Sequence, residues 1–283
     1  MSNRPAGHVA RSTVRPNGET GGRVPIRTYL TTADGIAIDS VYNPGPVVYE
    51  TPPDTSAPSP DGLAFVVAHG FTGDVDRPHV RRVAGVLARY GAVVTFSFRG
   101  HGRSGGRSTV GDREVLDLAA AVDRARALGH QRVVSVGFSM GGSVVLRHAA
   151  LHPGAVDAVV SVSAPARWYY RGTAPMRRLH WLVTRPEGRL VGRYGLRTRI
   201  HHRDWDPVPL SPTEATRRIP PTPLLIVHGD RDGYFPLDHP RMLAEAAGEQ
   251  GELWIEPGMG HAEHAADDTL LTRIGVWAAA KAG

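Results

Sequence analysis

The sequence predicts an α/β fold built on a mostly parallel sheet of eight strands, and two patterns indicate it. Short runs rich in Val and Ile alternate along the chain with segments whose apolar residues recur every three or four positions, which is the order expected of strand–helix–strand units. Most of the runs are continuously apolar, as strands are when both faces of a parallel sheet are covered. We therefore expect helices on both faces of the sheet.

The expected elements follow the chain in a simple order. Two opening strands, 27–32 and 36–42, precede a proline-rich stretch between residues 44 and 60, which we expect to be an exposed connection. Six further strands then alternate with helices. The strands are expected at 63–68, 92–98, 132–138, 156–163, 223–228 and 252–256, and the helices at 77–90, 112–128, 140–151, 238–247 and 266–280.

One long segment interrupts this alternation. Residues 164–219 lie between two strands and hold three of the five Trp residues and twelve Arg residues. Residues 1–26 also lie outside the alternation: they show no hydrophobic period and are expected to form a disordered basic tail. We therefore divide the chain into a tail (1–26), a first part of the core (27–163), an insertion (164–219) and a second part of the core (220–283).

Composition excludes several classes of protein. The 283 residues include no Cys, which excludes disulfides, thiolate metal sites and a Cys nucleophile. No apolar run approaches the roughly 18 residues of a membrane span, and the first residues have no hydrophobic signal region. We expect a cytoplasmic protein without an integral membrane span, and the sequence leaves its oligomeric state open.

The distribution of charge matters more than its total. The net charge is +6, but residues 1–27 carry +4 and residues 164–219 carry +8, so the remainder carries −6. An acidic body with two basic segments does not indicate a nucleic-acid partner. The arginines of residues 164–219 either form a solvated face or attract anionic substrates into a nearby cleft.

The strongest chemical signal is the G-x-S-x-G pattern around Ser139. It follows the expected strand 132–138 and opens directly onto the expected helix 140–151, which is the strand–turn–helix context of a nucleophile elbow. Gly137 and Gly141 fit a turn in which a side chain would collide with the neighbouring strand and helix. The N–H of Met140, the residue after the serine, is expected to face developing negative charge.

A serine nucleophile needs a base and an acid that orients the base. His261 follows the last expected strand through a short turn, which places it at the same edge of the sheet as Ser139. His264 is expected to begin or cap the final helix. Asp230 and Asp232 both follow strand 223–228, and their position alone does not choose between them.

Five motifs together resemble the α/β-hydrolase superfamily over about residues 27–282. They are HGFTG at 69–73, FRGHGRS at 98–104, GFSMGG at 137–142, HGDRD at 228–232 and GH at 260–261. Within the superfamily the chain is similar to the group that contains monoacylglycerol lipases, lysophospholipases, carboxylesterases and serine aminopeptidases. The resemblance implies the α/β-hydrolase fold, with residues 164–219 as a small cap over the active site.

The resemblance also assigns roles to residues. It implies a catalytic triad of Ser139, Asp232 and His261, because the family pattern G-x-x-D-x-x-x-P selects Asp232. It implies that the N–H of Phe71 joins that of Met140 in the oxyanion hole. Three further residues are expected to be structural: His69 packs under the oxyanion loop, and Arg99 and His101 hold the loop after Phe98.

The aromatic residues of the expected cap have two possible roles. Trp168, Tyr169, Tyr170 and Trp181 either line an acyl pocket or form a small core of the cap, and the sequence leaves both open. We expect a serine hydrolase that cleaves carboxylic esters of small or acyl-chain substrates, anionic ones included, through an acyl-enzyme. A thioesterase, an amidase or aminopeptidase, and a non-catalytic ligand-binding protein remain alternatives.

No cofactor or metal is expected from the sequence. The G-x-G-x-x-G pattern at 100–105 does not open directly onto a helix, as a dinucleotide site requires. The His-rich stretch at 201–206 matches no established pattern of metal ligands.

Overall fold

The computed structural model describes residues 24–46 and 62–283. The expected tail up to residue 23 and residues 47–61 of the proline-rich connection lie outside the described residues. The part of the chain that is described includes no helix with the length and apolar character needed to cross a membrane.

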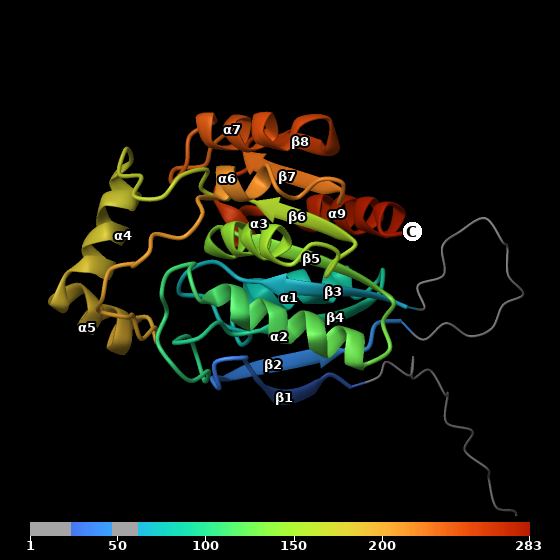
Figure 1. Cartoon of the computed structure of the whole chain (residues 1–283), viewed down its shortest axis with the longest axis horizontal. Coiled ribbons are helices and arrows are strands. Elements are labelled where there is room, and N and C mark those ends of the chain that lie inside the picture. Colours follow the sequence, from blue (N-terminus) through green and yellow to red (C-terminus); the bar gives the residue numbers. More distant parts are fainter. Residues whose placement is uncertain (1–23, 47–61) are drawn as a thin grey trace, which may run out of the picture.

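All eight expected strands join in one sheet, in the order β1-β2-β4-β3-β5-β6-β7-β8 (Figure 1). The pairings of β2 with β1 and with β4 are antiparallel, and the others are parallel. The prediction of a mostly parallel sheet is therefore confirmed. The strands are β1 (Ile26–Thr31), β2 (Ala37–Asn43), β3 (Leu63–Ala68), β4 (Ala92–Phe96), β5 (Arg132–Phe138), β6 (Ala158–Val162), β7 (Leu224–Gly229) and β8 (Gly251–Glu256).

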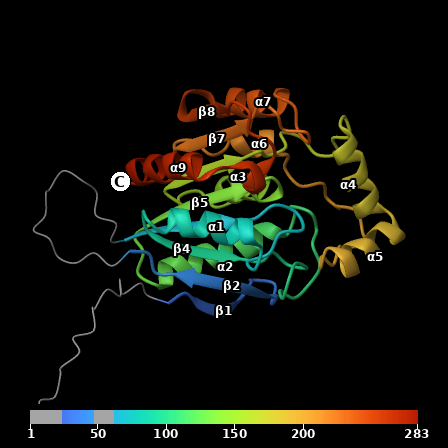
Figure 2. The ribbon, with the colours of Figure 1, turned by 180° about the vertical axis from the view of Figure 1, so that it is seen from behind.

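Helices cover both faces of the sheet, as Figures 1 and 2 show from opposite sides. On one face lie α1 (Pro78–Leu87) and α9 (Asp268–Lys281), and on the other lie α2 (Glu114–Ala127), α3 (Met140–Leu151) and α7 (Asp238–Ala247). The final helix begins two residues later than expected, because Asp267 caps it by accepting a hydrogen bond from the N–H of Leu270. The short helix α8 (Ala262–Ala265) precedes it.

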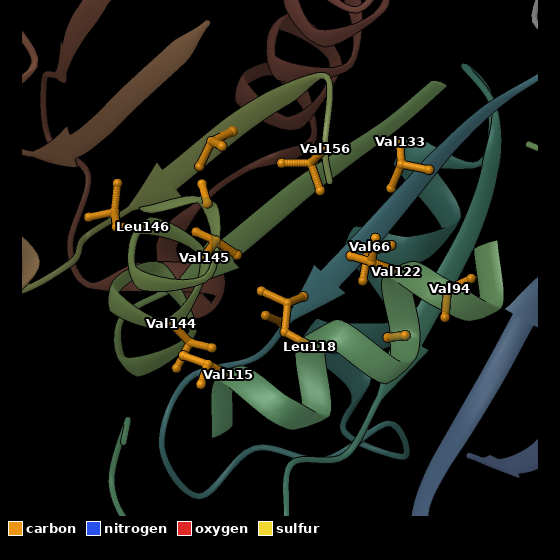
Figure 3. Packing of buried hydrophobic residues seen from close by; sticks show 14 of the residues in the cluster. Val66, Val94, Val115, Leu118, Val122, Val133, Val144, Val145, Leu146 and Val156 are labelled. Atoms are coloured by element: carbon orange, nitrogen blue, oxygen red, sulfur yellow. The ribbon is translucent and has the colours of Figure 1, made fainter. Parts of the chain in front are cut away.

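The continuous apolar runs are explained by the two cores that they supply. In β3, Val66 packs into the core beneath α2 and α3, while its neighbours Phe65 and Val67 pack into the core beneath α1 and α9. Figure 3 shows the first of these cores, where Leu118 of α2 and Val145 of α3 meet Val66. A strand covered on both faces has no position for a solvated side chain, so its sequence does not alternate.

The inserted segment forms three helices. α4 (Ala174–Thr184) and α5 (Pro186–Gly195) stand off one side of the sheet, in yellow in Figure 1. α6 (Pro212–Thr216) returns to the body and packs against α3 and α7. Its start is fixed by a capping box, in which the Ser211 hydroxyl accepts from the N–H of Glu214 and the Glu214 carboxylate accepts from the N–H of Ser211.

The loop after β4 is held by Arg99, as the sequence analysis expected. The Arg99 side chain is 3% exposed, and its guanidinium lies 2.8 Å from Asp117 and 2.7 Å from Asp34. The Asp117 carboxylate, which is fully buried, also accepts from the backbone N–H of Arg99. The ion pair therefore joins the loop to α2.

Replacing Arg99 by methionine is expected to lower the free energy of unfolding by about 3 kcal/mol, because Asp117 then stays buried without its cationic partner. Urea unfolding at pH 7 measures the loss. Arg103→Met is the matched control, since Arg103 is 57% exposed and its ion pair with Asp76 is long, at 3.8 Å. This replacement should lower the free energy of unfolding by less than about 1 kcal/mol. Equal losses in the two variants would contradict this role for Arg99.

Candidate active site

Ser139 stands on a strained turn between β5 and α3. Its φ is 51° and its ψ is −112°, a combination that L residues seldom adopt and that functional sites tolerate. The flanking glycines are required by space: a Cβ on Gly137 would overlap the carbonyl of Gly141, and a Cβ on Gly141 would overlap the carbonyl of Ala68. The turn thus holds Ser139 at the carboxyl end of β5, just beyond the sheet.

The structure brings His261 and Asp232 to this serine. His261 Nε2 lies 2.9 Å from Ser139 Oγ, and His261 Nδ1 lies 2.7 Å from Asp232 Oδ2. The three residues follow β5, β7 and β8, whose carboxyl ends lie at one edge because these strands are parallel. The Tyr234 ring stacks on His261 with its centroid 4.2 Å away, which restricts the orientation of the imidazole.

The environment of Asp232 favours its ionised form. Burial raises the pKa of Asp232, but the hydrogen bond and charge of His261 outweigh it, and the pKa lies below its usual value. The carboxylate also accepts from the N–H groups of Tyr234 and Phe235 at 2.8 and 3.1 Å. A carboxylate held in this way fixes the proton of His261 on Nδ1 and leaves Nε2 free to accept one.

The alternative acid and base take other positions. Asp230 accepts a hydrogen bond from the N–H of Gly258 at 2.6 Å and so holds the turn after β8. His264 lies on α8, exposed, with its ring against that of His79. It neither begins nor caps α9, because α8 and the cap Asp267 come between. Neither residue forms a hydrogen bond or ion pair with Ser139 or His261 in the part of the chain that the structure describes.

The two expected oxyanion donors are free of other partners. The backbone N–H groups of Phe71 and Met140 donate no hydrogen bond to any described residue, and both residues line the same cavity as Ser139. The Phe71 turn is supported from below by His69, whose Nδ1 lies 2.7 Å from the carbonyl of Gly70 and whose Nε2 accepts from the N–H of Phe98. Burial lowers the pKa of His69 to about 4, so it stays neutral and structural, as expected.

A cavity of about 230 Å³ opens beside Ser139. Its floor is formed by the elbow and by Phe71, and its walls come largely from the inserted segment. Trp168, Tyr169 and Tyr170 line it, and Trp168 packs edge to face on Trp205 at 5.1 Å. Trp168, Tyr169 and Tyr170 therefore line the cavity, and Trp168 and Tyr169 also pack on Trp205.

Trp181 is the exception, since the structure does not bring it to the cavity. Met176, Leu179, His180 and Val183 of α4 line the cavity, and they recur at the three- and four-residue spacing of one helix face. Trp181 falls outside that face and is 48% exposed. The sequence analysis did not single out the apolar residues of this face, because α4 was not expected as a helix.

The cavity carries excess positive charge. Arg167, Arg171 and Arg203 line it, with Asp204 as the one lining carboxylate among the described residues. Arg167 is paired with Asp238 at 2.8 Å. Arg171 and Arg203 form no ion pair with any residue in the described ranges, and Arg171 Nε donates a hydrogen bond to His180 Nδ1 at 3.2 Å.

Glu263 is a buried residue near the site that sequence reasoning missed. It is 3% exposed, and its Oε1 accepts from the N–H of Gly70 at 2.9 Å. It follows His261 by two residues and thus links the turn of His261 to the turn of Phe71. No motif marked it, since this contact joins residues 193 positions apart.

Comparisons with known proteins agree with this geometry. A family model described as the α/β hydrolase fold matches residues 64–188. A monoacylglycerol lipase of Mycolicibacterium smegmatis is 29% identical over 253 residues, covering 76% of this chain and 85% of that protein. The chain is thus similar to a lipase over most of the length of both proteins.

Two solved structures share the fold at low sequence identity. An esterase of Pyrococcus furiosus matches with a TM-score of 0.68 and 22% identity, covering 92% of this chain and 94% of the esterase. Est1E of Butyrivibrio proteoclasticus, solved with ferulic acid bound, matches with a TM-score of 0.58 and 20% identity, covering 90% of this chain and all of that one. The chain therefore has the α/β-hydrolase fold, and over 76% of its length it is similar to a monoacylglycerol lipase.

Proposed function

We propose that the chain hydrolyses carboxylic esters through a covalent acyl-enzyme on Ser139. The observation that carries the proposal is the unbroken line of hydrogen bonds from Ser139 through His261 to Asp232, which ends beside the cavity. A hydroxyl becomes a nucleophile when an adjacent base removes its proton, and here the base is in turn oriented by a buried carboxylate.

The reaction has two halves. Ser139 Oγ attacks the ester carbonyl carbon while its proton moves to His261 Nε2, and the resulting oxyanion accepts hydrogen bonds from the N–H groups of Met140 and Phe71. His261 then gives that proton to the alcohol oxygen, and the C–O bond breaks to leave the acyl group on Ser139. In the second half His261 takes a proton from water, the hydroxide attacks the acyl carbon, and the acid leaves as Ser139 regains its proton.

We infer that residues 164–219 act as the cap of this site and bind the acyl part of the substrate. The apolar face of α4 and the aromatic side chains of Trp168 and Tyr169 supply an apolar lining. A cavity of about 230 Å³ suits a small or medium acyl group. The guanidinium groups of Arg171 and Arg203, which have no carboxylate partner in the described ranges, favour substrates that carry negative charge away from the ester.

The substrate preference is tested with neutral and anionic esters, thioesters and amides of equal acyl length. We expect esters to be the best substrates, and the anionic ester to have a kcat/KM about 3- to 10-fold above the neutral one at low salt, falling as salt screens the charges. Arg203→Gln should remove much of this preference. Arg193→Gln is the matched control, since Arg193 is exposed on α5 and does not line the cavity.

The two parts of the proposal fail in different ways. A preference for neutral esters without salt dependence would contradict the role of the arginines and leave ester hydrolysis standing. Better turnover of amides or thioesters than of esters would contradict the assigned substrate class.

A further inference from the structure

Three side chains with metal-ligating atoms meet next to the turn that carries Phe71, and the proposed hydrolysis uses none of them. They are His79 on α1 and Glu263 and His264 on α8. One ligating atom from each lies within 4.8 Å of the others. His79 Nε2 is 3.9 Å from Glu263 Oε1, and the rings of His79 and His264 lie 3.8 Å apart between centroids.

Two atoms of this cluster are buried without a partner. Glu263 is 3% exposed, and its Oε2 has no hydrogen-bond partner among the described residues; neither has the buried Nε2 of His79. A buried carboxylate oxygen without a partner is costly. Arg82 does not relieve it, because its guanidinium donates to the carbonyls of Glu263 and Ala266 and to Asp268 instead.

The donor set identifies the ligand that would satisfy these atoms. Two imidazoles and one carboxylate form the ligand set of open zinc sites, with Zn–N and Zn–O distances of about 2.0–2.2 Å. A bound ion would draw the three ligating atoms, which lie within 4.8 Å of one another, closer together.

We propose that His79, Glu263 and His264 bind one divalent transition-metal ion, with zinc the best match. The ion would tie α1 to α8. Because Glu263 also accepts from the N–H of Gly70 and lies two residues after His261, a bound ion would restrain the turns of both His261 and Phe71. Its role is structural, since the proposed reaction routes no proton or electron pair through it.

Zinc binding to the chelator-treated full chain tests the proposal, with a competing chromophoric chelator as the readout. We expect one equivalent of Zn²⁺ per chain and an affinity that falls at least about tenfold in His264→Asn and in Glu263→Gln. His264 is exposed, so its replacement should leave the fold intact even if Glu263→Gln does not. Zinc at 100 times its wild-type Kd should raise the Tm of the wild type by about 4 °C and that of His264→Asn by no more than about 2 °C.

His202→Asn is the matched control, because His202 is exposed and stacks on His201 at 5.1 Å between centroids. It should bind zinc as the wild type does, and so should Ser139→Ala, which separates this inference from the proposed hydrolysis. No zinc bound by the wild type, unchanged affinity in His264→Asn, or loss of binding in His202→Asn alone would overturn the proposal.

Discussion

Replacing Ser139 by alanine is expected to lower kcat for a simple ester by roughly 10⁴- to 10⁶-fold. The variant keeps the cavity and the oxyanion donors but has no hydroxyl to attack the carbonyl. The ester can then be hydrolysed only by direct attack of water, which is much slower. Steady-state hydrolysis of a chromogenic ester measures the loss. Binding of a non-hydrolysable ester analogue should be nearly unchanged, because the side chain that is lost acts in the reaction rather than in recognition.

Ser161→Ala is the matched control for this experiment. Ser161 is a buried serine on β6 that donates to the carbonyl of Gly142 at 3.2 Å and does not line the cavity. Its replacement should change kcat by less than about tenfold. A Ser139→Ala enzyme that kept a tenth of the wild-type rate would show that the nucleophile lies elsewhere.

The second large effect is expected at Asp232. In Asp232→Asn the amide presents an N–H to His261 Nδ1, which favours the tautomer with its proton on Nε2 and removes the base, so kcat should fall by about 10³- to 10⁴-fold.

The pKa of Asp232 lies below its usual value, so the wild-type carboxylate stays ionised from neutral pH into mild acid. Its contribution to stability is present above its unfolded-chain pKa and is lost as pH falls through the folded pKa.

The measurement is kcat between pH 5 and 9 for Asp232→Asn and for Asp230→Asn. Asp230 bonds the N–H of Gly258 and has no described contact with His261, so its replacement should cost less than about tenfold. A larger loss in Asp230→Asn than in Asp232→Asn would reverse the assignment of the acid.

The sequence specified the central elements well because their residues are fixed by burial and by tight turns. Strands β3 and β5 and helices α3 and α7 begin and end where the pattern placed them. The β3 run is continuously apolar, the β5 run is interrupted only by Ser135 after its first residue, and each ends at a turn, so their limits are visible in the sequence alone. Ser139 and His261 were placed by their positions after strands whose carboxyl ends lie at the same sheet edge, whereas Asp232 was selected over Asp230 by the resemblance to the α/β-hydrolase superfamily.

The parts that the sequence did not predict depend on contacts between distant residues. Helices α4 and α5 carry many arginines and, apart from Met176, bury no large apolar side chain. The helical spacing of Met176, Leu179 and Val183 is the signal in the sequence that could have found α4. Trp181 was expected at the cavity because aromatic residues suit such a lining, but its helical phase turns it outward. The meeting of His79 with His264 joins α1 to α8 across most of the chain, and neither residue lies in a motif that would pair them.

The covalent step is the central claim, and mass spectrometry of the intact protein after reaction with a fluorophosphonate probe tests it most directly. The probe reacts with serines activated by an adjacent base, so the wild type should gain the mass of one adduct, and peptide mapping should place it on Ser139. Ser139→Ala should gain none, while Ser161→Ala should react as the wild type does. No adduct on the wild type, or an adduct on a residue other than Ser139, would contradict the account.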